Sequence, residues 1–343
     1  MKTKAAVLYE IGKELVVDDL EIPELERGQV LVKILYSGLC GSQLNEIKGR
    51  KGEDKYLPHL LGHEGSGIVE KVGPGVKKFK KGDFVVLTWI KGSGIDAPSC
   101  KYKKNSQTIN SGAISTFSNF SVISENRLVK ISKKIPADIA ALLGCAFPTG
   151  AGIIKNILRV KKGSSIAIFG IGGIGSSAVL AAKFFGCAKI IAVDIYEHKL
   201  EFAKELGATH TINTKNEDAA TKIKELTGGL CVDYSVECSG NGKAMETAFE
   251  SLHDKGIAVI AGNLAKGEKI SIDPFDLIKG KKIFGTWGGE TNLDKDIPLY
   301  AKMYLAGKLK LDKLITQKYG LGEINNAFAE LENGEIIRGL IKF

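Results

Sequence analysis

Residues 164–194, SSIAIFGIGGIGSSAVLAAKFFGCAKIIAVD, decide how the chain folds. The apolar run at 166–169 is typical of a buried strand, and it leads into the glycine turn Gly170-Ile171-Gly172-Gly173-Ile174-Gly175. An alanine-rich helical stretch follows, and a second apolar run at 190–193 ends at Asp194. Strand, turn, helix and strand in this order predict a crossover between two parallel strands.

The glycine turn predicts a dinucleotide-binding site. Glycines at this place let the backbone approach a pyrophosphate, which the unpaired N–H groups of the helix N-terminus attract. Asp194 follows the turn at roughly the 20-residue distance at which a carboxylate holds the ribose hydroxyls. A tight turn without a nucleotide is the alternative, but the strand, the helix and the acid all favour the dinucleotide. The predicted cofactor residues here are Gly170, Gly172, Gly173, Ile174, Gly175 and Asp194.

Length and charge describe an ordinary globular protein of two domains. The chain has 343 residues and a formal net charge of +9. The charge comes from lysines spread along the chain, which is typical of a solvated surface, whereas nucleic-acid sites more often cluster arginine. No segment approaches the ~18 apolar residues of a membrane span. We therefore expect a cytoplasmic protein that binds neither nucleic acid nor a membrane.

The cysteines favour metal binding or free thiols over disulfides. Six cysteines are scattered through a long chain without the dense spacing of a secreted scaffold. Cys40 and His63 lie at the ends of strand-like runs with small neighbours, and Cys145 lies within 138–151, a stretch that starts like a helix. The three could bind zinc together. Each alone is as well explained as a buried thiol or a structural histidine.

The pattern of elements changes along the chain. Residues 1–90 alternate short strand-like runs with turns, which indicates a small barrel-like β domain. Residues 91–112 lose this periodicity and read as a long surface excursion; they contain only Cys100, so we expect no four-cysteine zinc site there. From 164 to 285, strands alternate with helices, which predicts a doubly wound parallel sheet with helices on both faces. A strand is expected at 270–272 within this region.

Several motifs, in order, make the chain resemble the zinc-dependent medium-chain alcohol dehydrogenase/reductase family over essentially its whole length. They are Cys40-Gly-Ser42, Gly62-His63-Glu64 with the glycines after it, the cofactor turn after Cys145, and Ile336-Ile337-Arg338-Gly339. The resemblance implies an α/β protein with a GroES-like β-barrel catalytic domain at 1–148, completed by 287–343, and a Rossmann NAD-binding domain at 149–286.

The resemblance also implies roles for individual residues. Cys40, His63 and Cys145 would hold one catalytic zinc ion. Ser42 would take the alcohol proton, and Glu64 would be a carboxylate behind the ligands or a transient ligand. The remaining implied residues are Thr149 at the nicotinamide, Lys199 at the adenosine ribose, Arg338 at the pyrophosphate and Trp89 in the substrate pocket. Asp194 would favour NAD over NADP, because a carboxylate repels a 2′-phosphate.

The chain departs from the family pattern at three places. The lobe that often holds a structural zinc lacks its cysteines, so we expect no structural zinc. Gln43 replaces a frequent aspartate that orients the zinc-bound histidine. Asn45 replaces the usual proton-relay histidine, which leaves the proton route beyond Ser42 open.

The residues and the resemblance together predict a zinc-dependent alcohol dehydrogenase that exchanges a hydride between NAD and a small-molecule alcohol, aldehyde or ketone. The resemblance also implies a homodimer or homotetramer. One alternative is a zinc-free enone or quinone reductase of the same superfamily. Another is a nucleotide-binding protein of this fold without catalysis. The substrate itself does not follow from the sequence.

Overall fold

The computed structural model describes residues 1–343, and the chain divides into two units. The first unit is Met1–Cys145 with Asn292–Phe343, and the second is Ala146–Thr291. The family resemblance predicts domain boundaries at 148/149 and 286/287. No helix is long and apolar enough to cross a bilayer.

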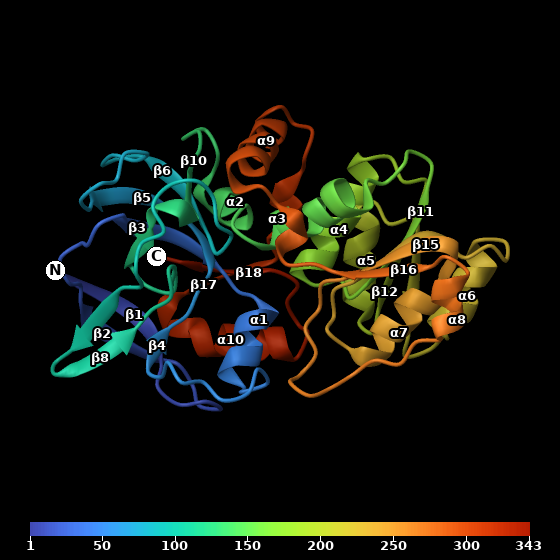
Figure 1. The fold of residues 1–343 in the computed structure, drawn as a ribbon, viewed down its shortest axis with the longest axis horizontal. Coiled ribbons are helices and arrows are strands. Elements are labelled where there is room, and N and C mark those ends of the chain that lie inside the picture. The colour runs from blue at the N-terminus through green and yellow to red at the C-terminus, as the bar shows by residue number, and fades with distance from the viewer. The chain divides into compact units, whose positions relative to one another are not determined.

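The first unit is built from a closed barrel and a second sheet (Figure 1). The barrel order is β1-β2-β7-β8-β4, with β1 (Lys2–Leu8), β2 (Val16–Glu21), β7 (Lys101–Lys104), β8 (Gln107–Asn110) and β4 (His59–Leu60). The other sheet is ordered β10-β6-β5-β3-β18-β17, and β9 pairs with β3. Its strands are β3 (Gln29–Gly38), β5 (Glu64–Val72), β6 (Phe84–Thr88), β9 (Phe120–Ser124), β10 (Leu128–Lys130), β17 (Gln317–Gly320) and β18 (Gly339–Lys342).

The prediction that 91–112 is only a surface excursion is wrong. Its second half forms the antiparallel hairpin of β7 and β8, which pairs through β2 and β4 into the barrel. Tyr102 and Ile109 are fully buried and the lysines beside Tyr102 are not. Such short strands each send one large apolar side chain inward, so the hydrophobic alternation is too brief to be seen in the sequence.

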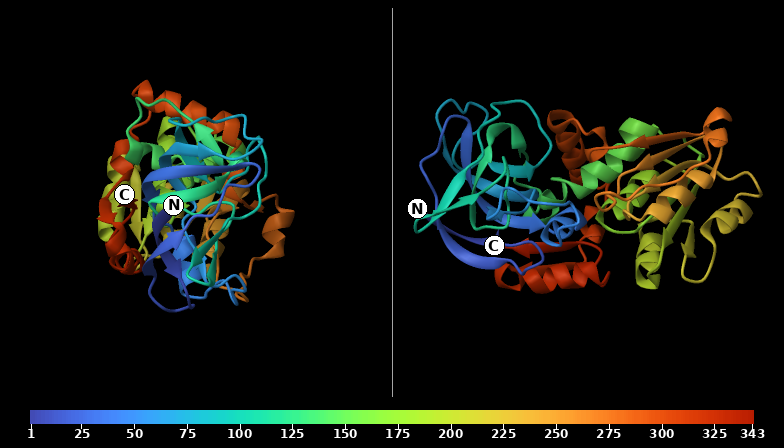
Figure 2. Two further views of the ribbon diagram at one scale, coloured as in Figure 1. Left: turned by 90° about the vertical axis from the view of Figure 1, so that its left-hand side faces the viewer. Right: turned by 60° about the horizontal axis from the view of Figure 1, so that its bottom comes forward.

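The C-terminal segment completes the first unit. Strand β18 pairs antiparallel with β3, and Figures 1 and 2 show helix α10 (Ile324–Glu332) beside the N-terminal strands. Ile324, Ala327 and Phe328, spaced as one helix face, are buried against a core that includes Ala6 and Leu8. The other helices of this unit are α1 (Gly41–Ile47), α2 (Ala137–Leu142) and α9 (Leu293–Leu305).

The second unit is the predicted doubly wound sheet, with all neighbouring strands parallel. The order is β13-β12-β11-β14-β15-β16, with β11 (Ser165–Phe169), β12 (Lys189–Asp194), β13 (His210–Asn213), β14 (Val232–Glu237), β15 (Leu252–Ile260) and β16 (Lys282–Gly285). Its helices are α3 (Ala146–Gly152), α4 (Gly173–Phe184), α5 (Glu197–Leu206), α6 (Ala219–Leu226), α7 (Gly242–Glu250) and α8 (Pro274–Ile278), and a π-helical turn (Ile153–Leu158) follows α3. The strand expected at 270–272 is wrong, since β16 alone forms that edge.

Both faces of this sheet are covered, as its apolar strands require. Alternate residues of β11, Ala167 and Phe169, share a core with Ile223 of α6 and Phe249 of α7. The strand order changes direction at β11 and β14, so their carboxyl ends open a crevice in which ligands bind to folds of this class. The predicted glycine turn leaves β11 at this point.

Candidate active site

Three metal-ligating side chains come together within the first unit. Cys40 lies between β3 and α1, His63 lies between β4 and β5, and Cys145 follows α2. Their ligand atoms all lie within 4.8 Å of one another. Two thiols and one imidazole at this spacing suit tetrahedral zinc and leave its fourth position for a water molecule or a substrate oxygen.

A helix break positions Cys145. In the sequence, the stretch 138–151 starts like a helix, and the structure divides it into two helices, α2 and α3, separated by a short turn. In this turn, a Cβ atom on Gly144 would lie 2.4 Å from the Leu87 carbonyl oxygen and 2.8 Å from the Glu64 Cβ. Only glycine permits this close approach of the backbone to β5 and β6. The break therefore brings Cys145 to the other two ligands.

The electrostatics of the cluster prepare it for a cation. A hydrogen bond from Cys145 holds the pKa of Cys40 well below its usual value, with help from the nearby His63 and against the effect of burial. The same hydrogen bond, together with burial, raises the pKa of Cys145. One thiolate is thus already favoured beside a thiol whose proton a metal ion can displace.

A buried ion pair lies behind the metal cluster. Glu64 is fully buried and Arg338 is 4% exposed, and the guanidinium pairs with the carboxylate and donates to the Leu39 carbonyl oxygen. A Cβ atom on Gly38 would lie 2.5 Å from the Glu64 Oε1 and 2.6 Å from the Arg338 Nη2. Burial raises the pKa of Glu64 and the positive Arg338 opposes this. The role of Arg338 at the pyrophosphate stays a prediction. What the structure shows is its ion pair with Glu64.

Trp89, Ser42 and Gln43 are the other predicted residues in the first unit. The Trp89 Nε1 donates to the Cys145 Sγ over 3.2 Å, which fixes one edge of the half-buried indole. Ser42 lies in the first turn of α1 and is partly buried. Gln43 is 2% exposed, and both of its amide atoms lack a hydrogen-bond partner, so it does not orient His63 by a direct hydrogen bond.

In the second unit, the glycine turn has the shape that a pyrophosphate needs. Gly170 has a φ of +84°, and a Cβ atom on Gly175 would lie 1.9 Å from the Gly170 carbonyl oxygen. A Cβ atom on Gly172, in contrast, would meet no atom within 4 Å. Two of the glycines are therefore required by the fold, whereas the third borders open space at the N-terminus of α4, where an anion is favoured.

Asp194 ends β12 beside this turn. Its Oδ2 accepts from the Ile171 N–H over 2.7 Å, and its Oδ1 accepts from the Ile195 N–H over 2.7 Å. Asp194 lines a cavity of about 380 Å³ together with Thr214 and Thr247, which is large enough for a purine or a ribose. The carboxylate is thus held in place where the ribose hydroxyls are expected.

Lys199 and Thr149 also have features that fit a dinucleotide. The Lys199 ammonium lies 4.7 Å from the centre of the Tyr196 ring, and burial lowers the pKa of this lysine. Thr149, in α3, is 4% exposed and its hydroxyl has no hydrogen-bond partner. A buried hydroxyl without a partner costs free energy that a bound amide group would recover.

Sequence reasoning missed Glu237, a buried carboxylate at the end of β14. It accepts hydrogen bonds from the N–H groups of Ser239, over 2.6 Å, and Gly240, over 2.9 Å. These hydrogen bonds shape the turn after β14, which packs closely against Gly170. A Cβ atom added to Gly170 would lie 2.7 Å from the Ser239 nitrogen. A signal was present, because the run VDYSVE, like IIAVD, is a buried strand that ends on an acid.

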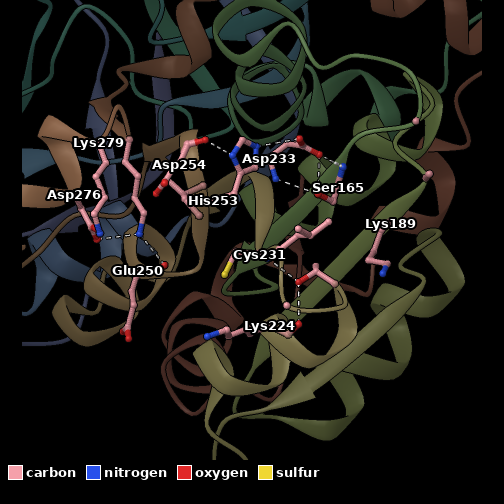
Figure 3. A pocket seen from close by; sticks show the side chains of 17 residues that line it. Ser165, Lys189, Lys224, Cys231, Asp233, Glu250, His253, Asp254, Asp276 and Lys279 are labelled. Atoms are coloured by element: carbon pink, nitrogen blue, oxygen red, sulfur yellow. Dashed lines mark hydrogen bonds and ion pairs between the residues drawn. The ribbon is translucent and has the colours of Figure 1, made fainter.

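A groove of about 860 Å³ lies at the opposite, amino-terminal edge of the same sheet (Figure 3). The Asp233 carboxylate there accepts from the Ser165 hydroxyl over 2.7 Å and lies 3.2 Å from the His253 Nε2. Ser165 and His253 both bind the aspartate rather than each other, so the group joins β11, β14 and β15 and is not a nucleophile with its base. The groove therefore adds nothing to the dinucleotide site.

The chain thus combines a thiolate–imidazole metal cluster with a dinucleotide turn, the two sites of a metal-dependent dehydrogenase. A family model described as "Alcohol dehydrogenase GroES-like domain" matches residues 26–133, and one described as "Zinc-binding dehydrogenase" matches residues 173–303. Alcohol dehydrogenase 1 of Pisum sativum is 34% identical over 372 residues, covering 100% of this chain and 97% of that protein.

Solved structures agree with these matches. The benzyl alcohol dehydrogenase of Acinetobacter calcoaceticus has a TM-score of 0.90 and 32% identity, over 100% of this chain and 99% of the other. An alcohol dehydrogenase zinc-binding domain protein of Burkholderia ambifaria has a TM-score of 0.92 and 32% identity with the same coverage. The chain belongs to the zinc-dependent medium-chain alcohol dehydrogenase family. It is an oxidoreductase that acts on alcohols, and its family uses zinc and a nicotinamide dinucleotide.

Proposed function

We propose that the chain transfers a hydride between NAD and an alcohol or carbonyl substrate at a single catalytic zinc. The meeting of Cys40, His63 and Cys145 carries this proposal, because packing alone gives no reason to place two thiols around an imidazole. When bound, zinc would polarise the substrate oxygen and the dinucleotide would exchange the hydride.

The chain's own residues hold the reactants and move the proton. Ser42, in the first turn of α1, takes the proton of the alcohol hydroxyl or returns it. The Trp89 indole, fixed by its bond to Cys145, forms an apolar wall for the substrate. The ion pair of Glu64 and Arg338 holds the backbone next to His63 in place. The hydroxyl of Thr149, which has no hydrogen-bond partner in the protein, binds the nicotinamide.

NAD rather than NADP is the proposed dinucleotide. The Asp194 carboxylate is fixed by backbone amides and lines the cavity beside the glycine turn, with Lys199 in the helix that follows. A fixed carboxylate binds two ribose hydroxyls but repels a 2′-phosphate. Arg338 keeps its proposed role at the pyrophosphate.

Domains, assembly and location complete the proposal. The catalytic domain is 1–148 with 287–343, and the NAD-binding domain is 149–286, without a structural zinc in the lobe at 91–112. β16 is an edge strand, and Phe284 on it and Ile278 beside it are 47% and 78% exposed, which favours a homodimer or homotetramer assembled through this edge. The free cysteines suit the reducing cytoplasm.

The test measures turnover and bound metal together. NADH absorbance is followed with a panel of alcohols, aldehydes and ketones, beginning with benzyl alcohol because of the similarity to the Acinetobacter enzyme and because of Trp89. Cys40→Ser is expected to lose the thiolate-bound metal and the turnover together. Cys100→Ser, a buried thiol in the barrel, is the matched control and should keep both.

Two outcomes would contradict the proposal. Turnover that survives in Cys40→Ser after chelation would point to a zinc-free enone or quinone reductase. Tight NADH binding without turnover on any member of the panel would point to a non-catalytic nucleotide-binding protein of the same fold.

A further inference from the structure

A second cluster of metal-ligating atoms lies in the first unit, apart from the three ligands above. Glu46 in α1, Asp54 in the loop after it and His59 in β4 place one ligand atom each within 4.8 Å of the others. The His59 Nε2 lies 2.7 Å from the Asp54 Oδ2 and 3.9 Å from the Glu46 Oε1. Imidazole and carboxylates in this number suit a divalent transition-metal ion.

The orientation of His59 directs its Nε2 at the cluster. Its Nδ1 lies 3.0 Å from the Leu60 carbonyl oxygen, and its Nε2 lies 2.7 Å from the Asp54 Oδ2. When the Nδ1 donates to that carbonyl oxygen, the Nε2 has a lone pair that can bind a metal ion. Hydrogen bonds from the other ring nitrogen commonly orient metal-bound histidines.

The carboxylates are positioned in the same way. The Asp54 Oδ1 accepts from the Tyr56 N–H over 2.9 Å, which leaves Oδ2 directed at His59. The Glu46 Oε2 binds the Lys51 ammonium over 2.8 Å, and Oε1 is the atom nearer to His59. With bonds of about 2.1 Å to each ligand, a metal would hold nitrogen and oxygen roughly 3.0–3.4 Å apart, so the Asp54–His59 pair needs to open by only a few tenths of an ångström.

A cavity beside the cluster can supply the remaining ligands as water. Its volume is about 470 Å³, and its lining includes Glu46, His59, Gln43 and the candidate zinc ligand His63. Gln43 is 2% exposed, and neither its amide nitrogen nor its amide oxygen has a hydrogen-bond partner. A buried amide of this kind requires polar atoms in the cavity it lines. Water molecules that bind a metal and donate to Gln43 would satisfy both needs.

We propose that Glu46, Asp54 and His59 form a second divalent-metal site, selective for metals that prefer nitrogen and oxygen ligands and filled independently of the catalytic zinc. The side chains are 29%, 13% and 8% exposed, so an ion can reach the site from solvent and is then partly enclosed. The bound ion would join the loop that contains Asp54 to α1 and β4.

The test is metal stoichiometry of the full-length protein at saturating, buffered free Zn²⁺. The wild-type chain is expected to hold about two metal equivalents. Asp54→Asn and Glu46→Gln, which change charge but hardly shape, should each weaken the second equivalent about tenfold or more. Glu53→Gln removes an exposed charge from the same loop and should keep both equivalents.

Co²⁺ substitution separates this site from the catalytic one. The thiolate-to-metal absorption band should survive in Asp54→Asn and vanish in Cys40→Ser, which should still bind Co²⁺ at the second site. A wild-type chain that binds only one equivalent, or a second equivalent unchanged in both Asp54→Asn and Glu46→Gln, would overturn the proposal and leave His59 and Asp54 as a hydrogen-bonded pair. Failure of the proposed dehydrogenase function would look different. The thiolate-to-metal band would then be present in the wild-type chain, but no alcohol, aldehyde or ketone would be turned over.

Discussion

Arg338, close to the C-terminus, forms a buried ion pair with Glu64 next to the candidate zinc ligand His63. The pair is almost completely shielded from bulk water, since Glu64 is 0% exposed and Arg338 is 4% exposed. Removing one member of such a pair leaves an uncompensated buried charge, which costs far more than loss of a surface pair.

Arg338→Met is therefore expected to lower the free energy of unfolding by about 3–5 kcal/mol, measured by urea denaturation. Lys318→Met, which breaks the surface pair with Asp138, is the matched control and should cost about 1 kcal/mol or less. The double variant Glu64→Gln/Arg338→Met should regain part of the loss. If it is as unstable as the single variant, the two charges do not depend on each other.

Gly38→Ala should disturb the same pair from the opposite side. The new Cβ atom would lie 2.5 Å from the Glu64 Oε1 and 2.6 Å from the Arg338 Nη2, which forces both side chains to move. We expect a loss of about 1–3 kcal/mol in the free energy of unfolding. Gly322→Ala, at a position of the same unit with no atom within 4 Å, should be neutral within about 0.5 kcal/mol.

Two glycines of the cofactor turn should separate folding from binding. Gly175→Ala places a Cβ atom 1.9 Å from the Gly170 carbonyl oxygen, so it should destabilise the second unit in thermal unfolding. Gly172→Ala meets no protein atom within 4 Å and should leave the unfolding temperature nearly unchanged. It should still weaken NADH binding about tenfold or more, measured by fluorescence titration, because the methyl group occupies the approach of the pyrophosphate. Equal NADH affinity in Gly172→Ala and the wild type would place the dinucleotide elsewhere.

Asp194→Ser tests the choice of dinucleotide. Removal of the carboxylate should weaken NADH binding about tenfold. It should also lower the ratio of NADH affinity to NADPH affinity, because the carboxylate no longer repels a 2′-phosphate. Asp218→Asn removes another charge from the lining of the same cavity, and we expect it to leave the NADH-to-NADPH ratio unchanged. A ratio that does not move in Asp194→Ser would mean that this carboxylate does not contact the ribose.

Glu125 should make the first unit sensitive to acid. Burial would raise the pKa of the Glu125 carboxyl. Hydrogen bonds from three backbone N–H groups lower this pKa instead; they come from Ile95, Lys78 and Lys77, with nitrogen-to-oxygen distances of 2.8–3.0 Å. A pKa below the unfolded value stabilises the fold above about pH 4.3, and this stability is lost as the pH falls through the folded pKa.

Glu125→Gln should therefore be less stable than the wild type by about 1–3 kcal/mol at pH 7, and the difference should shrink toward pH 3.5. Urea denaturation at a series of pH values measures this. A difference that stays constant with pH would show that the charge of Glu125 is not what holds the loops at 77–78 and 95.

The second unit could be predicted from the sequence almost completely, because buried parallel strands are continuous apolar runs punctuated by glycine turns. The turn from Gly170 to Gly175 and the acid at Asp194 each lie where the pattern predicts. The hairpin of β7 and β8 could not be predicted, since only Tyr102 and Ile109 mark its buried side.

The candidate site, too, could be predicted only in part. The residue types at Cys40, His63 and Cys145 could be read, but their meeting depends on the helix break at Gly144, which is enforced by contacts with β5 and β6. Likewise, nothing local to Glu64 indicates that its partner comes from the other end of the chain. Short-range patterns predict elements, whereas such long-range contacts follow only from packing.

The return of the C-terminal segment to β3 sets a constraint on biosynthesis. Synthesis runs from the N-terminus, so Glu64 and the metal ligands leave the ribosome long before Arg338 and β18 do. Until those last residues emerge, the first sheet lacks a strand and Glu64 lacks its counter-charge. A nascent or truncated chain that ends before β17 should therefore depend on chaperones, and stable metal loading should follow the synthesis of β18.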